Sequence, residues 1–258
     1  MLVTVEGIVI GRRSIGEDSC FIDVLTDEYG VIEATAHGVK KITSKNAGST
    51  ALFSYAKFCF AKSGIRYTLN SAEPKYSFHG ISEDIEYLSL AVYFADVIKD
   101  TSASEQESKG FLRFMAVTLY ELDKKRRPPE LIKSVFELHL CAMLGFSPDL
   151  RACRICMRYE HERMFFDFEE SCIVCGDCVT EYSHSSSELT PLTPSLLYAM
   201  RHMVFSPVDK IYKIEINGED MKNLSGITEK YLLKQLDRGF RSLEYYYSVK
   251  PGKICGHK

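Results

Sequence analysis

The sequence predicts an α+β protein with an N-terminal β-barrel followed by a helical domain. Short β-rich segments crowd the first 78 residues, and apolar residues then recur at helical spacing. Two C-x-x-C pairs interrupt the helical part near the middle of the chain. We therefore expect one domain over residues 1–78 and a second over residues 79–258.

The first domain contains five candidate strands separated by polar, glycine-bearing turns. These strands are rich in β-branched and aromatic residues, and they occupy residues 2–10, 20–25, 31–36, 52–61 and 66–69. Five short strands within 78 residues fit an OB-fold barrel of the kind that binds nucleic acid. An SH3-like barrel is the alternative. Pro74 is expected to close the segment, and Arg12 with Arg13 should lie in the first connection.

Helices are expected to take over after residue 78. Ser82 can cap a helix whose first turn carries Glu83, Asp84 and Glu86, and these acidic side chains suit the positive end of the helix dipole. The other expected elements are helices at 111–122, 128–145, 195–204 and 228–247 and a short strand at 211–216.

The cysteine pairs are the strongest functional signal. Cys153, Cys156, Cys175 and Cys178 have the spacing of a four-thiolate zinc site, which has no open coordination position and is structural. We expect a zinc-finger insertion at about residues 150–182. Cys172 opens the alternative of an iron–sulfur ligand run, Cys172-x-x-Cys175-x-x-Cys178. The lone cysteines are expected to be small buried apolar residues: Cys20, Cys59, Cys141 and Cys255.

Basic residues are unevenly distributed, although the net charge of the chain is −3. No Asp or Glu occurs between Ala34 and Ala72, where six Lys and Arg residues fall. One cationic side of the barrel is expected to follow a phosphate backbone, with Phe53, Tyr55 and Tyr67 available to stack on bases. The candidate DNA-binding residues are Arg12, Arg13, Lys40, Lys41, Lys45, Lys57, Lys62 and Arg66.

A second basic set lies near the C-terminus. Lys234, Arg238 and Arg241 are spaced to share one helix face, which would extend a nucleic-acid path or dock an acidic protein. For both basic sets a solvated charged surface is the alternative explanation.

Binding is favoured over catalysis. The sequence has no Walker-type phosphate loop, no G-x-S-x-G elbow and no H-E-x-x-H pair. No apolar run approaches the roughly 20 residues that a membrane span needs. Glu6 is a charge too early for a signal-peptide core, so a cytoplasmic protein is expected.

An ordered set of short segments carries a family resemblance along nearly the whole chain. The segments are Val5–Ile10, Leu25–Gly30, Ala36–Lys41 with Ser44–Lys45, Leu144–Pro148, Leu150–Cys156, and Tyr231–Arg238 with Arg241–Ser242. In this order and spacing they resemble RecO, a family of bacterial recombination mediators that anneal DNA. The family usually has a glycine pair before the second C-x-x-C, where this chain has Ser171 and Cys172 instead.

The resemblance implies an OB fold, a helical domain with an embedded zinc finger, and binding of single- and double-stranded DNA. It also implies strand annealing and recombinational repair, with RecR, the acidic C-terminal tail of SSB and, indirectly, RecA as partners. A protein-interaction adaptor with little direct DNA contact is the second candidate function.

Overall fold

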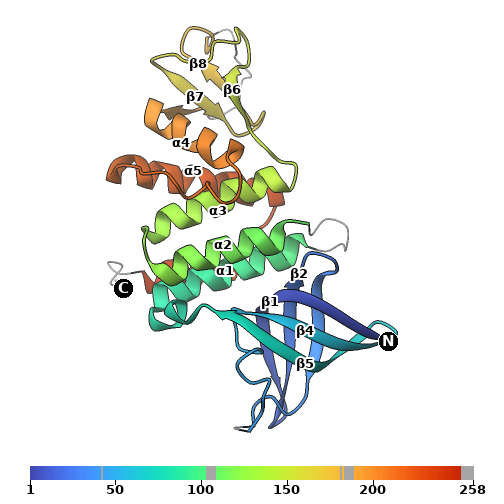
Figure 1. The fold of residues 1–258 in the computed structure, drawn as a ribbon. Coiled ribbons are helices and arrows are strands. Elements are labelled where there is room, and N and C mark those ends of the chain that lie inside the picture. The colour runs from blue at the N-terminus through green and yellow to red at the C-terminus, as the bar shows by residue number, and fades with distance from the viewer. Residues whose placement is uncertain (42, 103–108, 181, 183–188, 251–258) are drawn as a thin grey trace. The chain divides into compact units, whose positions relative to one another are not determined.

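The computed structural model describes residues 1–41, 43–102, 109–180, 182 and 189–250 (Figure 1). Ile42 in the basic segment, Glu181 near the end of the expected finger, and Cys255 lie outside the described residues. The chain forms two compact units, Met1–Arg127 with Phe240–Lys258 and Pro128–Gly239. The boundary expected at residue 78 stays a prediction.

The first unit contains a closed five-stranded barrel in the order β1-β2-β3-β5-β4. β3 and β5 pair in parallel and the other neighbours are antiparallel, as in an OB fold, so this prediction is confirmed. The strands are β1 (Leu2–Ile15), β2 (Ser19–Thr26), β3 (Gly30–Ala36), β4 (Ser54–Ser63) and β5 (Arg66–Ser77).

Alternating apolar side chains fill the barrel. Val3 and Val5 of β1, Ile22 of β2, and Phe58 and Phe60 of β4 are all buried in one cluster. This period of two is the pattern that the sequence displayed, because successive side chains of a strand point to opposite faces.

Close approach of β1 and β2 requires small residues. A Cβ at Gly7 would lie 2.5 Å from Val24 Cγ1 and 2.7 Å from the carbonyl oxygen of Leu25. A Cβ at Gly11 would lie 2.4 Å from Asp23 Oδ2. A side chain at Gly7 would push the two strands apart, and one at Gly11 would displace the buried Asp23 carboxylate.

The strands are longer than expected. β1 passes a register shift between Val9 and Gly11 and continues to Ile15, so Arg12 and Arg13 lie on the strand and not in a connection. Pro74 does not end β5. It lies opposite a register shift in β4, where a missing N–H is tolerated, and β5 continues to Ser77.

Helices complete the first unit. They are η1 (His79–Glu83), α1 (Ile85–Thr101), α2 (Phe111–Lys124) and α6 (Arg241–Val249). Ser82 does not cap α1 because it lies within η1. Asp84 is the cap, and its carboxylate accepts a hydrogen bond from the backbone N–H of Glu86 at 2.9 Å.

The second unit combines helices with a small four-stranded sheet in the order β6-β8-β7-β9. Its elements are α3 (Pro129–Met143), β6 (Asp149–Cys153), β7 (Met164–Asp167), β8 (Cys172–Cys175), β9 (Leu189–Leu192), α4 (Pro194–Phe205) and α5 (Gly218–Leu236). The helices predicted at 128–145 and 195–204 correspond to α3 and α4.

Two expectations for the C-terminal part are wrong. Residues 211–216 form no strand, although burial of Ile211, Tyr212 and Ile214 resembles a strand pattern. The helix expected at 228–247 is broken, because α5 ends at Leu236 and Asp237 adopts a left-handed φ of 49°.

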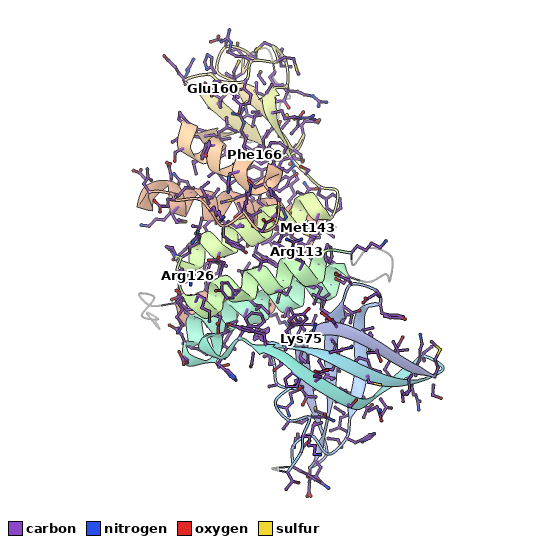
Figure 2. The ribbon with its side chains drawn as sticks, in the orientation of Figure 1. Lys75, Arg113, Arg126, Met143, Glu160 and Phe166 are labelled. Carbon is purple, nitrogen blue, oxygen red and sulfur yellow. The ribbon has the colours of Figure 1, made fainter. Side chains whose placement is uncertain are left out.

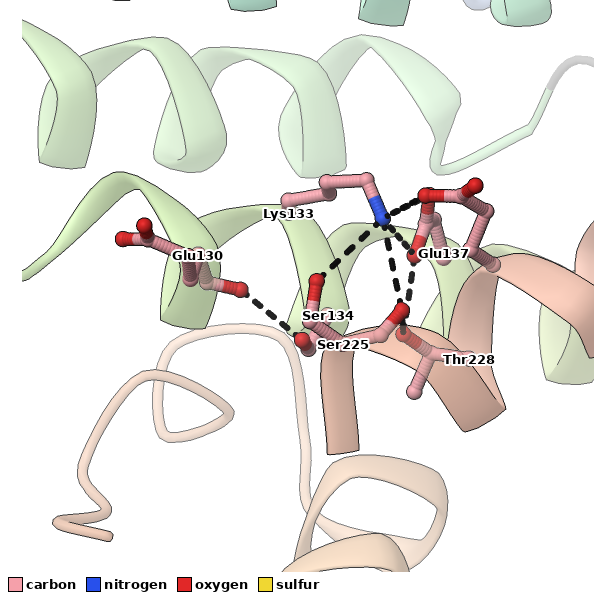
Figure 3. Close-up of polar contacts among 7 residues, drawn as sticks. Glu130, Lys133, Ser134, Glu137, Ser225 and Thr228 are labelled. Atoms are coloured by element: carbon pink, nitrogen blue, oxygen red, sulfur yellow. Dashed lines mark hydrogen bonds and ion pairs between the residues drawn. The ribbon is translucent and has the colours of Figure 1, made fainter. Parts of the chain in front are cut away.

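A buried ion pair joins α3 to α5 (Figure 3). Lys133 Nζ lies 3.0 Å from a carboxylate oxygen of Glu137 and 2.7 Å from one of Glu229. Thr228 donates its hydroxyl to Glu137 at 2.8 Å, and Ser225 offers two further oxygens to Lys133 at 3.4 Å. Each buried charge therefore has several polar partners, as burial in an apolar interior requires.

Among the described helices, none combines the length and apolar character that crossing a membrane would take.

Candidate metal centre and nucleic-acid interface

Four cysteine side chains converge at one edge of the small sheet. The sulfur atoms of Cys153, Cys156, Cys175 and Cys178 all lie within 4.8 Å of one another. Cys153 ends β6 and Cys175 ends β8, and because these strands pair in parallel, both pairs reach the same edge. Four thiolates placed in this way can hold a metal ion in a tetrahedral structural site.

Each C-x-x-C pair forms a tight turn around its sulfurs. The Met157 N–H donates to the carbonyl oxygen of Cys153 at 3.0 Å, and Met157 adopts a left-handed φ of 59°. The Cys178 N–H donates to the carbonyl oxygen of Cys175 at 3.1 Å. The Cys175 N–H points at the Cys153 sulfur, 3.3 Å away. The backbone thus presents donors to the sulfurs before any ion binds.

The electrostatics of the cluster favour a bound cation. Burial disfavours the Cys153 thiolate, but backbone N–H groups of Cys156, Cys175 and Ile155 outweigh it and lower the pKa of Cys153 to about 6. Burial and hydrogen bonds with the neighbouring sulfurs raise the pKa of Cys178 to about 12. A divalent ion placed among the four sulfurs would stabilise their thiolate forms.

Cys172 does not belong to the cluster. Its sulfur lies 3.4 Å from the hydroxyl of Tyr182, which in turn donates to Asp167 at 2.9 Å. All three side chains are buried. The described cluster therefore contains the two C-x-x-C pairs, and not the run through Cys172 that an iron–sulfur site would use.

Exposed charged side chains connect the two C-x-x-C turns to each other. Asp177 accepts from Arg158 at 2.7 Å and lies 3.1 Å from Nε2 of His161. The hydrogen bond from Arg158, and to a smaller extent the neighbouring His161, lower the pKa of Asp177 below its usual range. These contacts link the segment after the first pair to the second pair, which stabilises the geometry of the ligands.

The basic residues predicted to bind DNA occupy four places on the barrel. One groove beside β3 is lined or contacted by Arg13, Lys62 and Arg66. The segment after β3 carries Lys40, Lys41 and Lys45. Strand β1 carries Arg12, and strand β4 carries Lys57.

Several of these cations face carboxylates. Arg13 pairs with Glu33, and Lys41 lies 3.3 Å from Asp18. Lys57 stands opposite Glu6 on one neighbouring strand and Glu73 on the other. Folding therefore brings acidic residues from before Ala34 and after Ala72 next to part of the acid-free stretch.

One surface groove combines cations with aromatic rings. It has a volume of about 580 Å³, and Phe21, Tyr29 and Tyr67 line it together with Ile65 from the β4–β5 turn and Arg66 at the start of β5. Ile65 is 94% exposed. In addition, Lys62 Nζ lies 4.9 Å from the centroid of the Tyr67 ring. We call this the barrel groove.

The predicted stacking rings have different environments. Tyr67 lines the barrel groove, whereas Phe53 is buried and Tyr55 donates its hydroxyl to Glu6. Phe21 and Tyr29 were not among the rings predicted to stack on bases. Phe21 alternates with buried residues on β2, and this pattern could have indicated that its ring faces outward. Tyr29 was considered only as part of the turn before β3, although its ring lines the groove.

The second basic set does not form one helix face. Lys234 is on α5, Arg238 follows its end, and Arg241 begins α6 in the other compact unit. Lys234 also pairs with Glu169 at 2.5 Å. The expected path along one helix is wrong because the chain turns at Asp237.

A further basic run, Lys124–Arg127, closes α2 and was not singled out from the sequence. Lys124 pairs with Asp123 at 2.8 Å, and the guanidinium of Arg126 lies 5.9 Å from the centroid of the Tyr120 ring. Figure 2 labels Arg126 in the first unit. The run of four consecutive basic residues could have indicated a third basic segment from the sequence alone.

Family models match almost the whole chain. The model of the Recombination protein O N terminal matches residues 1–78, and that of the Recombination protein O C terminal matches residues 82–244.

Curated relatives agree over nearly their full lengths. A protein of Alkaliphilus metalliredigens called DNA repair protein RecO is 28% identical over 247 residues, which are 95% of this chain and 98% of the relative. Proteins of the same name from Acetivibrio thermocellus and Dehalococcoides mccartyi are each 26% identical. The first match covers 93% of this chain and 94% of the relative, and the second covers 85% of both.

Proposed function

Since this chain belongs to the RecO family of DNA repair proteins, we propose that it is a DNA-binding recombination mediator that anneals complementary strands. In this role the protein binds and positions nucleic acid and catalyses no bond chemistry. It would work with RecR and SSB to load RecA.

The barrel groove is the observation that supports DNA binding most directly. Arg66 and Lys62 supply positive charge beside Tyr67, and Phe21 and Tyr29 add ring surface. Single-stranded nucleic acid is held in this way, by cations along its backbone and aromatic rings on which successive bases stack. Stacking accepts every base, so the groove suits binding that is independent of sequence.

Three of the predicted residues, Lys40, Lys41 and Lys45, would extend this contact. Lys40 Nζ donates to the carbonyl oxygen of Gly16 at 3.1 Å, and Lys41 pairs with Asp18, so the segment after β3 contacts the β1–β2 turn. Lys45 is exposed in the same segment. Connections of an OB barrel commonly border its ligand, which favours a phosphate contact here.

Annealing follows from charge neutralisation without reading of bases. Cations that neutralise phosphates release counterions and reduce repulsion between two strands, while base pairing supplies the specificity. Such a process needs no nucleotide hydrolysis. Complementary labelled oligonucleotides mixed with the protein should anneal faster than without it.

The four-cysteine cluster would hold Zn²⁺ as a structural ion. Zinc accepts four thiolates in a closed tetrahedral site and has no redox chemistry. The buried positions of Cys153 and Cys175 within the sheet fit a folding role.

Partners can be tested one at a time. A peptide with the acidic C-terminal sequence of SSB, purified RecR, and an assay of RecA loading onto SSB-coated DNA would each address one proposed contact. Binding of the peptide should weaken with salt, since an acidic tail binds through charge.

A salt-titrated binding curve tests the role of the barrel groove. We would measure fluorescence anisotropy of a labelled oligothymidylate with the wild type and with Lys62→Gln/Arg66→Gln. Each phosphate contact on a single strand contributes about −0.7 to the slope of log affinity against log salt. Loss of two contacts should therefore reduce the magnitude of the slope by about 1.4.

The matched control is Lys57→Gln/Lys75→Gln, which removes two charges that face Glu6 on the barrel surface. Its slope should change little. Equal effects of the two double variants would show that the groove is not the DNA site.

The adaptor alternative has one observation in its favour. Residues 1–78 carry nine Lys and Arg against eight Asp and Glu, so the barrel is close to neutral. An adaptor would show little oligonucleotide affinity at any salt concentration, and the same titration distinguishes the two functions.

A further inference from the structure

A groove in the second unit lies between the segment before β7 and the start of α4. Its volume is about 390 Å³. Apolar side chains line one part of it: Met164, Leu192, Pro194 and Leu197. Two tyrosines and two glutamates line another: Tyr159, Tyr198, Glu160 and Glu162. We call it the tyrosine groove.

Both tyrosines expose large aromatic surfaces. Tyr159 is 58% exposed and Tyr198 is 66% exposed. Aromatic rings of this size bury much apolar area when a partner covers them, and exposed rings rimmed by polar groups mark interaction sites.

Arg201 holds Tyr159 in place. The guanidinium carbon lies 3.9 Å from the centroid of the Tyr159 ring. The same guanidinium donates to the carbonyl oxygens of Leu150 at 2.7 Å, Tyr159 at 2.8 Å and Arg151 at 3.1 Å. One wall of the groove is therefore ordered before binding, which lowers the entropy that a partner must overcome.

The charge of the groove is mainly negative. Glu160 and Glu162 are exposed, and within the described part of the chain neither carboxylate forms an ion pair or a hydrogen bond. Figure 2 labels Glu160 on the segment between β6 and β7. The remaining charged or titratable groups are engaged, because Arg201 binds three carbonyls and His161 faces Asp177.

We propose that the tyrosine groove is a docking site for a protein segment that carries a Lys or Arg side chain beside an apolar one. The cation would lie over the Tyr198 ring within reach of Glu160 and Glu162, because aromatic faces and carboxylates both attract cations. The apolar neighbour would contact Pro194, which is an exposed apolar residue of the lining. The same carboxylates repel phosphate, so this surface is separate from the proposed DNA contact and does not depend on it.

A pair of capped peptides tests the proposal on the full chain. Acetyl-Leu-Arg-Leu-amide and acetyl-Leu-Glu-Leu-amide would be titrated while the ring signals of Tyr159 and Tyr198 are followed by NMR. The arginyl peptide should shift both tyrosine signals saturably, and the glutamyl peptide should not. Binding of the glutamyl peptide alone, or of neither peptide, overturns the proposal.

Two variants locate the contact. Glu160→Gln/Glu162→Gln should weaken binding of the arginyl peptide about 2- to 30-fold, the range expected for two exposed ion pairs. The matched control is Glu170→Gln/Glu215→Gln, which removes two exposed carboxylates elsewhere in the same unit and should leave the affinity unchanged. An equal loss in both would mean that only net charge matters, which contradicts a built site.

Tyr198→Ala removes the exposed ring without emptying the core. It should abolish saturable binding while the thermal unfolding midpoint stays within a few degrees of the wild type, since this side chain is mostly solvated. Retained affinity in this variant would likewise overturn the proposal.

Discussion

The barrel and the small sheet of the second unit are stabilised in different ways. The barrel strands run from 7 to 14 residues and enclose a cluster of buried apolar side chains. The small sheet has strands of four or five residues and gathers four cysteine sulfurs at one edge. Burial can stabilise the first, whereas a sheet this small needs a further constraint such as a metal ion.

The largest expected effect separates the two regions directly. Cys175→Ser should abolish metal binding and unfold the small sheet, because metal affinities of about 10–16 kcal/mol in comparable fingers exceed what so few buried residues supply. Hydrogen exchange should show loss of protection in β7 and β8 and retained protection in β1 to β5. Elemental analysis of the wild type should find one zinc per chain.

Cys172→Ser is the matched control for that experiment. Its sulfur contacts Tyr182 and not the cluster, so the metal content should stay at the wild-type value. Loss of metal in this variant, with iron in the wild type, would instead support a cluster ligated through Cys172.

The second effect concerns the buried ion pair between α3 and α5. Lys133→Met leaves the buried Glu137 carboxylate beside Glu229, and breaking such a pair typically costs about 3–5 kcal/mol. Urea unfolding should report this loss. Because burial raises the pKa of Glu137, the double variant Lys133→Met/Glu137→Met should lose less stability than the single one.

In the first unit, the Asp123 carboxylate accepts several hydrogen bonds. Burial disfavours the Asp123 carboxylate, but hydrogen bonds from Lys124, Gly80 and Tyr76 outweigh this and lower its pKa below 3.8. A lowered pKa in the folded state means that the stabilisation is present above pH 3.8 and is lost as the pH falls through the folded value.

Asp123→Asn should therefore cost about 1 kcal/mol at neutral pH, the usual worth of such hydrogen bonds. The difference from the wild type should shrink when urea unfolding is repeated near pH 3. A constant difference across this pH range would show that the charge of Asp123 does not contribute.

The smallest effect is expected at Lys57. Glu6 and Glu73 flank it on the neighbouring strands, and exposed pairs of this kind contribute about 0–1 kcal/mol. Lys57→Gln should change stability by less than about 0.5 kcal/mol and leave oligonucleotide affinity close to that of the wild type. A large loss of DNA affinity would place the DNA path over β4 and away from the barrel groove.

Local patterns predicted much of the fold. Alternating apolar residues located all five barrel strands, and helical spacing located α2, α3 and α4. Strand ends were predicted less well. The bulge that lets β1 continue past Gly11 depends on its partner strand, and Pro74 is tolerated only because of the register shift opposite it.

The two parts of the candidate site differ in how far the sequence could predict them. The metal cluster was predicted residue by residue, because a C-x-x-C turn is local and four thiolates have one common geometry. The barrel groove was predicted only through Lys62, Arg66 and Tyr67. Phe21 and Tyr29 join it because β3 pairs with β5, which is a contact between distant segments.

The sequence by itself determined the five barrel strands, most of the helices, the four cysteines that cluster, and the family. Only the tertiary structure decided which charges stand near one another. Arg13 meets Glu33, and Lys57 stands between Glu6 and Glu73, through strand pairing that no local pattern encodes. Periodicity reports which face a residue occupies, whereas electrostatic surroundings depend on distances between segments far apart in the chain.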